Sequence, residues 1–307
     1  MSPDPAYLTP IIPRRSFLRR LFGVGRRLSW KQAFTALKYP NYRLWFWSQM
    51  FSLFGTWMES TALMFLGYKL TGSAAYLGLV GFASGAPTWI FMLYAGVIAD
   101  RMSRRTLIII TQTAMMVLAF VIAALAFLNA VQPWHILVIA VLLGVANAFE
   151  APARQAFVLE MVDLPDLTNA IALNGAMFNT ATAAGPAVAG VVYALFGPAW
   201  CFTINGVSFI AVIMALALMK LPRFVPKAEK TSAIADLKEG VKYVWGHPMI
   251  RTIIGLLGIV SLFGIAYAIL FPAWAVKILG GDATTNGFLQ ASRGLGALAG
   301  ALLIASL

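Results

Sequence analysis

Long apolar segments separated by short polar breaks run through most of this chain. Each segment has about 20 residues or more, enough for an α-helix to cross a hydrocarbon core of about 30 Å. Helices are expected because lipid cannot satisfy the hydrogen-bonding groups of an open backbone. The pattern predicts eight helices, at 44–68, 75–98, 105–128, 134–155, 168–195, 199–220, 249–277 and 284–307.

The polar segments divide the chain into four predicted parts. Residues 1–43 form a basic tail that precedes a six-helix bundle at 44–220. A polar linker at 221–248 follows, and 249–307 form the first two helices of a second bundle. Within the linker, the sequence DLKEGVKYVW at 236–245 is typical of an amphipathic helix on a membrane surface.

Composition supports a membrane protein. The residues are 60% hydrophobic and 11% charged, with a mean hydropathy of +0.80. Soluble domains have about 25% charged residues. The chain is therefore predicted to be an all-α integral membrane protein, and a soluble fold is excluded.

The net charge of +12 is distributed by topology. Nine of the 23 Lys and Arg residues precede the first apolar segment, and seven more lie in or beside the linker. Three arginines in 96–105 and Arg154 fall on the same predicted side, whereas Lys69 and Lys277 fall on the other. The positive-inside rule places the N-terminus in the cytoplasm of a multi-pass plasma (inner) membrane protein. This segregated charge is not typical of a nucleic-acid-binding protein, but the basic tail is suited to anionic membrane lipid.

An internal repeat appears when the chain is aligned with itself at an offset of 209 residues. The sequence Ser-Leu-Phe-Gly at 52–55 recurs at 261–264, and Gly78 and Gly85 match Gly287 and Gly294. Six helices separate the two copies, so the repeat predicts two parallel six-helix halves. A second copy of the 96–105 loop would fall at about 305–314 in the same register. We therefore expect six plus two helices of a twelve-helix fold that is incomplete at its C-terminus.

The loop GVIADRMSRR at 96–105 carries the main family resemblance. It is similar to the signature G-x-L-A-D-R-x-G-R-K of the major facilitator superfamily, with Ser103 at the usual Gly. The resemblance implies a gate in which Asp100 meets a helix N-terminus or an arginine, with Arg154 as a candidate partner. The alternative is that these charges only enforce topology. The residues assigned to the gating loop are Gly96, Asp100, Arg101, Arg104, Arg105 and Arg154.

A second resemblance lies at Gly185, Pro186 and Gly190 in the fifth predicted helix. These residues resemble a motif of drug and proton antiporters in the same superfamily, and the wider run from Glu150 resembles its siderophore exporters. The resemblance implies that the motif shapes the alternating-access path. Ordinary helix packing is the alternative, because a Gly-Pro pair locally disrupts a helix and small residues allow close packing.

Two charged residues lie within predicted spans. Glu59 is in the first helix and Arg293 in the eighth. A charge inside a membrane is costly and points to function. We assign both to proton coupling or substrate binding, with Glu59 as a candidate partner of Arg293. For Glu59 the alternative is that its side chain reaches the outer interface.

The combined prediction is a secondary active transporter that exports a small amphipathic compound, such as a drug or siderophore, in exchange for protons. A solute uptake transporter and a non-transporting membrane scaffold fragment remain alternatives. No catalytic constellation, nucleotide motif or metal-ligand spacing is present, and the single cysteine is Cys201. We therefore expect no enzymatic activity, no cofactor and no metal, and a monomer when the protein is full length.

Overall fold

The computed structural model describes residues 34–221, 239 and 242–306, and the described elements are all helical. The first group comprises η2 (Thr35–Lys38), α3 (Pro40–Thr71), α4 (Ala74–Arg101), α5 (Arg104–Phe127), α6 (Pro133–Phe157), η3 (Val158–Glu160), η4 (Leu164–Asp166), α7 (Leu167–Phe196) and α8 (Pro198–Leu218). The second comprises α10 (Pro248–Ile259), η5 (Val260–Ile265), η6 (Ala266–Leu270), α11 (Phe271–Lys277) and α12 (Ala283–Ser306).

Local capping explains where the helices stop. Gly72 ends α3 in the left-handed conformation, with φ of 62°, and Ser73 accepts a hydrogen bond from the Tyr76 amide at the start of α4. Ser103 caps α5 in the same way through the Thr106 amide. Both turns are therefore short, and they fix α3, α4 and α5 as antiparallel neighbours.

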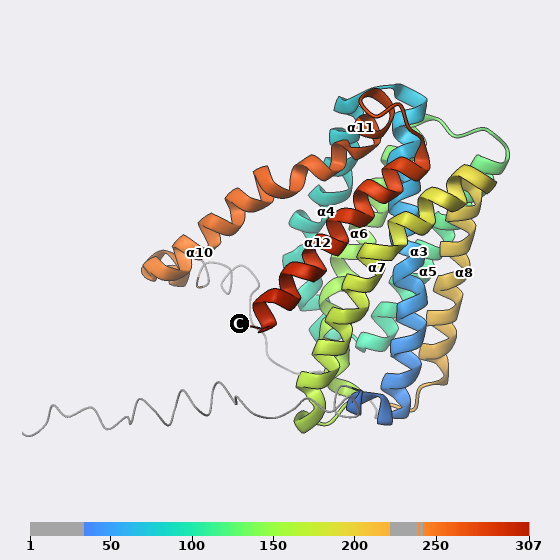
Figure 1. Cartoon of the computed structure of the whole chain (residues 1–307). Coiled ribbons are helices and arrows are strands. Elements are labelled where there is room, and N and C mark those ends of the chain that lie inside the picture. Colours follow the sequence, from blue (N-terminus) through green and yellow to red (C-terminus); the bar gives the residue numbers. More distant parts are fainter. Residues whose placement is uncertain (1–33, 222–238, 240–241, 307) are drawn as a thin grey trace, which may run out of the picture.

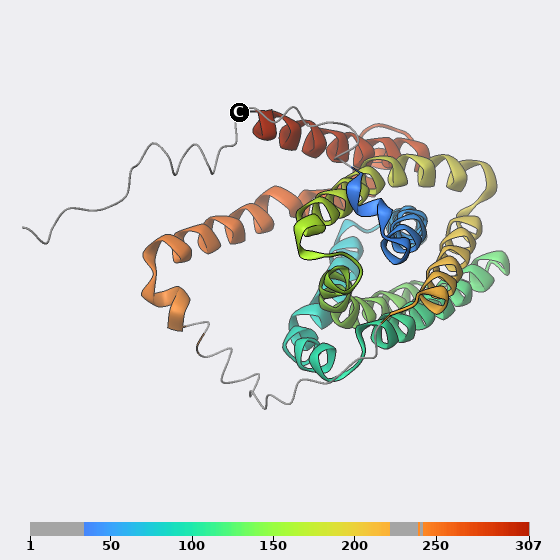
Figure 2. The same ribbon diagram turned by 90° about the horizontal axis from the view of Figure 1, so that it is seen from below.

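Helices α3 to α8 form one bundle, with α3 on the inside (Figures 1 and 2). Helix α3 packs on α7 and α8, α4 packs on α6, and α5 packs on both α6 and α8. Helix α12 lies along α7 on the outside of this bundle, whereas α10 extends away from it (Figure 2). We call the end that carries Lys38, Arg104, Arg105 and Arg154 the basic end.

Apolar side chains fill the bundle near both ends. Toward the basic end, Trp45 of α3 meets Phe157 of α6 edge to face, with ring centroids 5.3 Å apart. Toward the opposite end, Phe65 of α3 and Tyr193 of α7 make a similar contact at 5.1 Å. The level between them holds the polar residues discussed below.

Four helical segments in the described part of the chain are long and apolar enough to cross a membrane: Ala74–Phe91, Arg104–Phe127, Pro133–Glu160 and Pro198–Leu218. Helix α7 has 30 residues, and helix α3, with 32 residues, is more polar than the other long helices. In α3 the polar side chains of Ser48, Gln49, Ser52 and Glu59 are buried. The polar character of α3 therefore comes from residues that face the bundle and not the lipid.

The segment predicted as one helix at 249–277 is helical throughout, but it is not a uniform α-helix. The structure divides this segment into α10, a π-helical turn at Val260–Ile265, a 3-10 turn at Ala266–Leu270 and α11. Pro272 offers a physical reason, because it lacks an amide hydrogen and its ring crowds the carbonyl of residue 268. Half of the predicted amphipathic helix at 236–245 lies outside the described residues, and the described positions 239 and 242–245 are helical.

Candidate functional site

The two arginines that begin α5 bind neighbouring segments at the basic end. Arg104 donates to Glu160 Oε1 at 2.9 Å, as an ion pair, and to the Ala156 carbonyl at 3.3 Å. Arg105 donates to the carbonyls of Ala217 and Met219 at 3.0 and 3.4 Å. The start of α5 is thus attached to the ends of α6 and α8, where carbonyls without helical partners attract cations.

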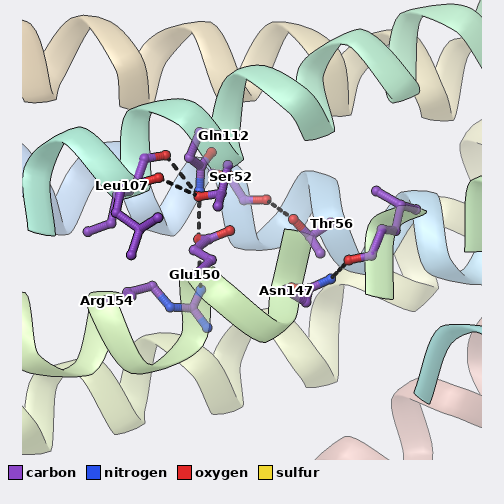
Figure 3. Close-up of polar contacts among 10 residues, drawn as sticks. Ser52, Thr56, Leu107, Gln112, Asn147, Glu150 and Arg154 are labelled. Atoms are coloured by element: carbon purple, nitrogen blue, oxygen red, sulfur yellow. Dashed lines mark hydrogen bonds and ion pairs between the residues drawn. The ribbon is translucent and has the colours of Figure 1, made fainter. Parts of the chain in front are cut away.

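A buried polar cluster lies deeper in the bundle, between α5 and α6 (Figure 3). Glu150 is 3% exposed and accepts a hydrogen bond from Gln112 Nε2 at 2.8 Å. Arg154, one turn further along α6, approaches the same carboxylate oxygen at 3.9 Å. Glu150 is therefore compensated by one donor and one positive charge, and Arg154 has a partner that the sequence did not suggest.

The remaining residues of the gating loop are only partly described. Asp100 and Arg101 end helix α4, which confirms that the charged run lies at a tight turn between two helices, but their side chains lie outside the described residues. The predicted contact of Asp100 with Arg154 therefore stays a prediction. Gly96 is part of α4, and a Cβ at this position would meet no atom within 4 Å.

A second polar cluster, which is exposed, holds η2 against the segment before α7. Lys38 Nζ lies 2.6 Å from Asp166 Oδ2, and the Tyr39 hydroxyl donates to Asp163 and Asp166. The hydrogen bond from Lys38 holds the pKa of Asp166 below its ordinary value, and the same bond raises the pKa of Lys38. Both charges are thus retained across the neutral range.

The central cavity has a volume of about 490 Å³ and is lined by α3, α4, α5, α6, α8 and η6. Within the described part of the chain, Glu59 is its one ionisable lining residue. Leu63, Met64, Met115 and Phe209 contribute apolar walls. The neutral polar residues that line the cavity are Thr56, Ser60, Ser84, Thr88, Asn147 and Asn205.

Glu59 is held inside the bundle, 3% exposed, and does not reach an interface. One carboxylate oxygen accepts a hydrogen bond from Asn205 Nδ2 of α8, and the other, Oε1, has no partner among the described residues. Ser208 donates to Asn205 Oδ1 at 3.1 Å, which turns the amide nitrogen toward Glu59. Asn205 and Ser208 can approach because position 55 is glycine: a Cβ there would lie 2.6 Å from Asn205 Oδ1.

The predicted pairing of Glu59 with Arg293 is not found among the described residues. Glu59 accepts its hydrogen bond from Asn205. Arg293 does not line this cavity and takes part in none of the ion pairs among the described residues. The reason is the packing of α12, which lies along α7 with Gly294 against Ala183. The faces of α3 and α12 that carry these two charges are therefore not joined.

The fifth-helix motif lies where α7 contacts two other helices. A Cβ at Gly185 would lie 2.7 Å from the Cβ of Trp57 on α3. A Cβ at Gly190 would lie 2.7 Å from the Ala283 carbonyl at the start of α12, and Pro186 offers its carbonyl close to Gly287. The motif thus provides the space for close packing on both sides of α7, and its role in an access path stays a prediction.

From the sequence, several of these residues were assigned no partner or site role. Asn205, Gln112 and Glu150 are polar residues within apolar segments, and Glu160 follows the fourth. That position alone was a usable signal, because a polar group inside a membrane needs a partner. Cys201, the single cysteine of the chain, is fully buried and its thiol donates to the Ala189 carbonyl.

Known proteins resemble this chain over most of its length. The staphyloferrin A transporter of Staphylococcus aureus is 27% identical over 85% of this chain and 66% of its own length. The macrolide efflux protein A of Streptococcus pyogenes is 22% identical, with coverage of 87% and 67%. The enterobactin exporter of Shigella boydii is 26% identical, with coverage of 89% and 65%. The chain thus spans about two thirds of the length of these relatives.

The family described as transmembrane secretion effector matches residues 31–307, which is nearly the whole chain. Its members are transporters and not enzymes, in agreement with the helical, membrane-capable structure. The chain therefore belongs to the transmembrane secretion effector family of the major facilitator superfamily.

Proposed function

We propose that this chain is part of a proton-coupled exporter of a small amphipathic compound. The family relation supports transport, and the names of the relatives include an enterobactin exporter and a macrolide efflux protein. Alternating access would occur between two six-helix halves, of which 44–220 is the first, with the N-terminus in the cytoplasm. Small-molecule substrate and protons are the transported partners, and a monomer is the functional unit.

The observation that carries the proposal is the state of Glu59. Its carboxyl is buried on a cavity that offers no positive charge within the described part of the chain. An ionised carboxylate is costly there, whereas a protonated one is not. Asn205 can hydrogen bond to either form through Glu59 Oε2. Glu59 is therefore suited to bind a proton in one state and to release it in another, and so to bias the equilibrium between them.

The basic end supplies the gate in this proposal. Arg104 and Arg105 attach α5 to the carbonyl ends of α6 and α8, and Arg154 pairs with Glu150. Opening this end would exchange these contacts for others, among which Asp100 and Arg101 are candidates by family resemblance. Gly185, Pro186 and Gly190 pack α7 closely against α3 and α12, and in this proposal α7 shifts between these helices during alternating access. Arg293 has no role in the proposal because no described contact connects it with the cavity.

Transport in proteoliposomes tests this function. The intact protein is reconstituted with an interior pH dye, a pH gradient is imposed, and a panel of fluorescent amphipathic compounds is added. We expect a transported compound to move against its gradient and to accelerate proton flux. Glu59→Gln should uncouple the two, whereas Glu239→Gln, at an exposed position outside the bundle, should match wild type.

Three outcomes contradict parts of the proposal. Coupling that is unchanged in Glu59→Gln would remove this residue as the proton site. Movement of every transported compound in the opposite direction under the same gradient would indicate an uptake transporter. Absence of transport for the whole panel, with normal membrane insertion, would favour the scaffold alternative.

A further inference from the structure

We infer that the cavity at Glu59 selects a positively charged amphipathic compound, such as a lipophilic amine, over an anion of the same size. This inference rests on the proposed function, because it names the substrate class of the same cavity. Its evidence is the chemistry of the lining and the unpartnered oxygen of one buried acid.

The described residues that line the cavity carry negative charge and no positive charge. Among the described residues that line the cavity, Glu59 is the ionisable one, and the other polar groups are amides and hydroxyls. None of the basic residues of the described chain lines it, although the whole chain carries a net charge of +12. The cavity is thus locally acidic in a basic protein.

A comparison of the two buried acids shows which one can accept a ligand. Glu59 and Glu150 are both 3% exposed. Glu150 already has Gln112 and the positive charge of Arg154. Glu59 has a neutral amide on one oxygen and nothing on Oε1 among the described residues. A buried carboxylate is stabilised most by a partner that is both charged and hydrogen-bonded. Glu150 has a positively charged partner in Arg154, whereas Glu59 has none among the described residues.

The remaining walls define the rest of the compound. A volume of about 490 Å³ is within the range of small-molecule sites. Leu63, Met64, Met115 and Phe209 present apolar surface, and methionine adapts to irregular shapes. On the α4 and α6 side, the exposed side chains of Ser84 and Asn147 leave the cavity open. A single positive charge on an apolar body fits this arrangement.

Two probes of opposite charge and nearly the same shape test the inference. Tetraphenylphosphonium and tetraphenylborate are bound to the purified chain in a neutral maltoside detergent, and equilibrium dialysis measures both dissociation constants. Nonspecific attraction to a chain of charge +12 favours the anion. We expect the opposite order, with the cation bound about tenfold more tightly or better, as a charge-assisted contact allows.

Variants of the cavity residues test whether the preference for the cation depends on Glu59. Glu59→Gln should lose it, and Glu59→Asp should keep it because the charge remains. Adding Asn147→Asp to Glu59→Gln should restore cation binding by placing a carboxylate on the α6 wall of the same cavity. Should Glu59→Gln fail to fold, Asn147→Asp alone provides the test, since a second carboxylate should tighten cation binding.

Equal affinities for the two ions in wild type would overturn the inference. So would a folded Glu59→Gln variant that binds the cation as tightly as wild type, or an Asn147→Asp variant that binds it no better. Transport is not part of these measurements. A chain that binds the cation selectively but shows no proton-coupled transport would therefore contradict the proposed function and leave the selectivity intact.

Discussion

The absence of a side chain at Gly55 allows Glu59, the acid on which the proposed mechanism depends, to receive its hydrogen bond. Gly55 lies one helical turn before Glu59 and allows Asn205 and Ser208 to approach α3. Without that approach, the Asn205 amide could not reach the carboxyl, and both oxygens of Glu59 would be unpartnered. The glycine and the amide are thus parts of one arrangement, although they are 150 residues apart in sequence.

We predict that Gly55→Ala disturbs the site more than its size suggests. The new Cβ would lie 2.6 Å from Asn205 Oδ1 and 2.8 Å from Ser208 Oγ, so the amide has to move away from Glu59. Leaving a buried group without its hydrogen bond costs about 1–3 kcal/mol. Thermal unfolding in detergent should show a lowered midpoint. Gly85→Ala is the control, because a Cβ there meets nothing within 4 Å, and an equal loss in both variants would contradict the explanation.

At the exposed cluster of Lys38 and Asp166, the pH dependence follows from the two pKa shifts. The pKa of Asp166 is lowered by the hydrogen bond from Lys38, so its contribution is present above the unfolded pKa and is lost as the pH falls through the folded value. The pKa of Lys38 is raised, so its contribution is lost only as the pH rises through that raised value.

Hydrogen exchange can measure this contact. We expect the protection of the Leu37 and Tyr39 amides of η2 to be constant between roughly pH 5 and 9, after correction for the intrinsic exchange rate. Protection should fall at lower pH, and high salt should weaken it because the pair is exposed. In Asp166→Asn the acid-dependent part should be absent. The same acid-dependent loss in that variant would assign the effect to another group.

At the scale of helices, glycine positions decide which elements meet. On α12, Gly294 faces α7, where a Cβ would lie 2.6 Å from the Cα of Ala183. Gly296 lies two residues further along the same helix and faces open space. The contact between α7 and α12 therefore depends on one face of α12.

We predict opposite results for leucine at these two positions. Gly294→Leu should lower stability by about 1–3 kcal/mol, the usual cost of overpacking, or separate α12 from α7. Gly296→Leu should be neutral or slightly stabilising, because leucine has the higher helix propensity. Thermal unfolding of the two variants in the same detergent gives the comparison. Similar destabilisation by both would show that the interface does not depend on this face.

Sequence patterns located the helices better than their contacts. The third predicted helix, expected at 105–128, is α5 at Arg104–Phe127, because a serine cap and a continuous apolar run mark its limits. The irregular turns before Pro272 were not predicted, since apolar length indicates a span but not its backbone hydrogen bonds. The Glu59 site was half predicted: the acid was visible as a charge in a span, but Asn205 as its partner depends on which helix faces meet.

The distribution of charge predicts the orientation of the whole molecule. Lys38, Arg104, Arg105 and Arg154 lie at one end of the bundle, while Lys69 ends α3 at the other. Two exposed leucines mark these ends: Leu164, 81% exposed, lies in η4 at the basic end, and Leu128, 75% exposed, follows α5 at the opposite end. Either can be replaced by cysteine with little effect on packing.

Labelling with a membrane-impermeant maleimide should therefore distinguish the two ends. In a Cys201→Ser background, Leu128→Cys should react in intact cells, and Leu164→Cys should react only after the membrane is permeabilised. The physical reason is the positive-inside rule, which retains the basic end in the cytoplasm. The parent Cys201 is fully buried and should remain unlabelled in both conditions, which controls for partial unfolding. If Leu164→Cys is labelled in intact cells and Leu128→Cys is not, the orientation is the opposite of the predicted one. The contacts of Arg104 and Arg105 would then lie at the outer face and form the outer gate.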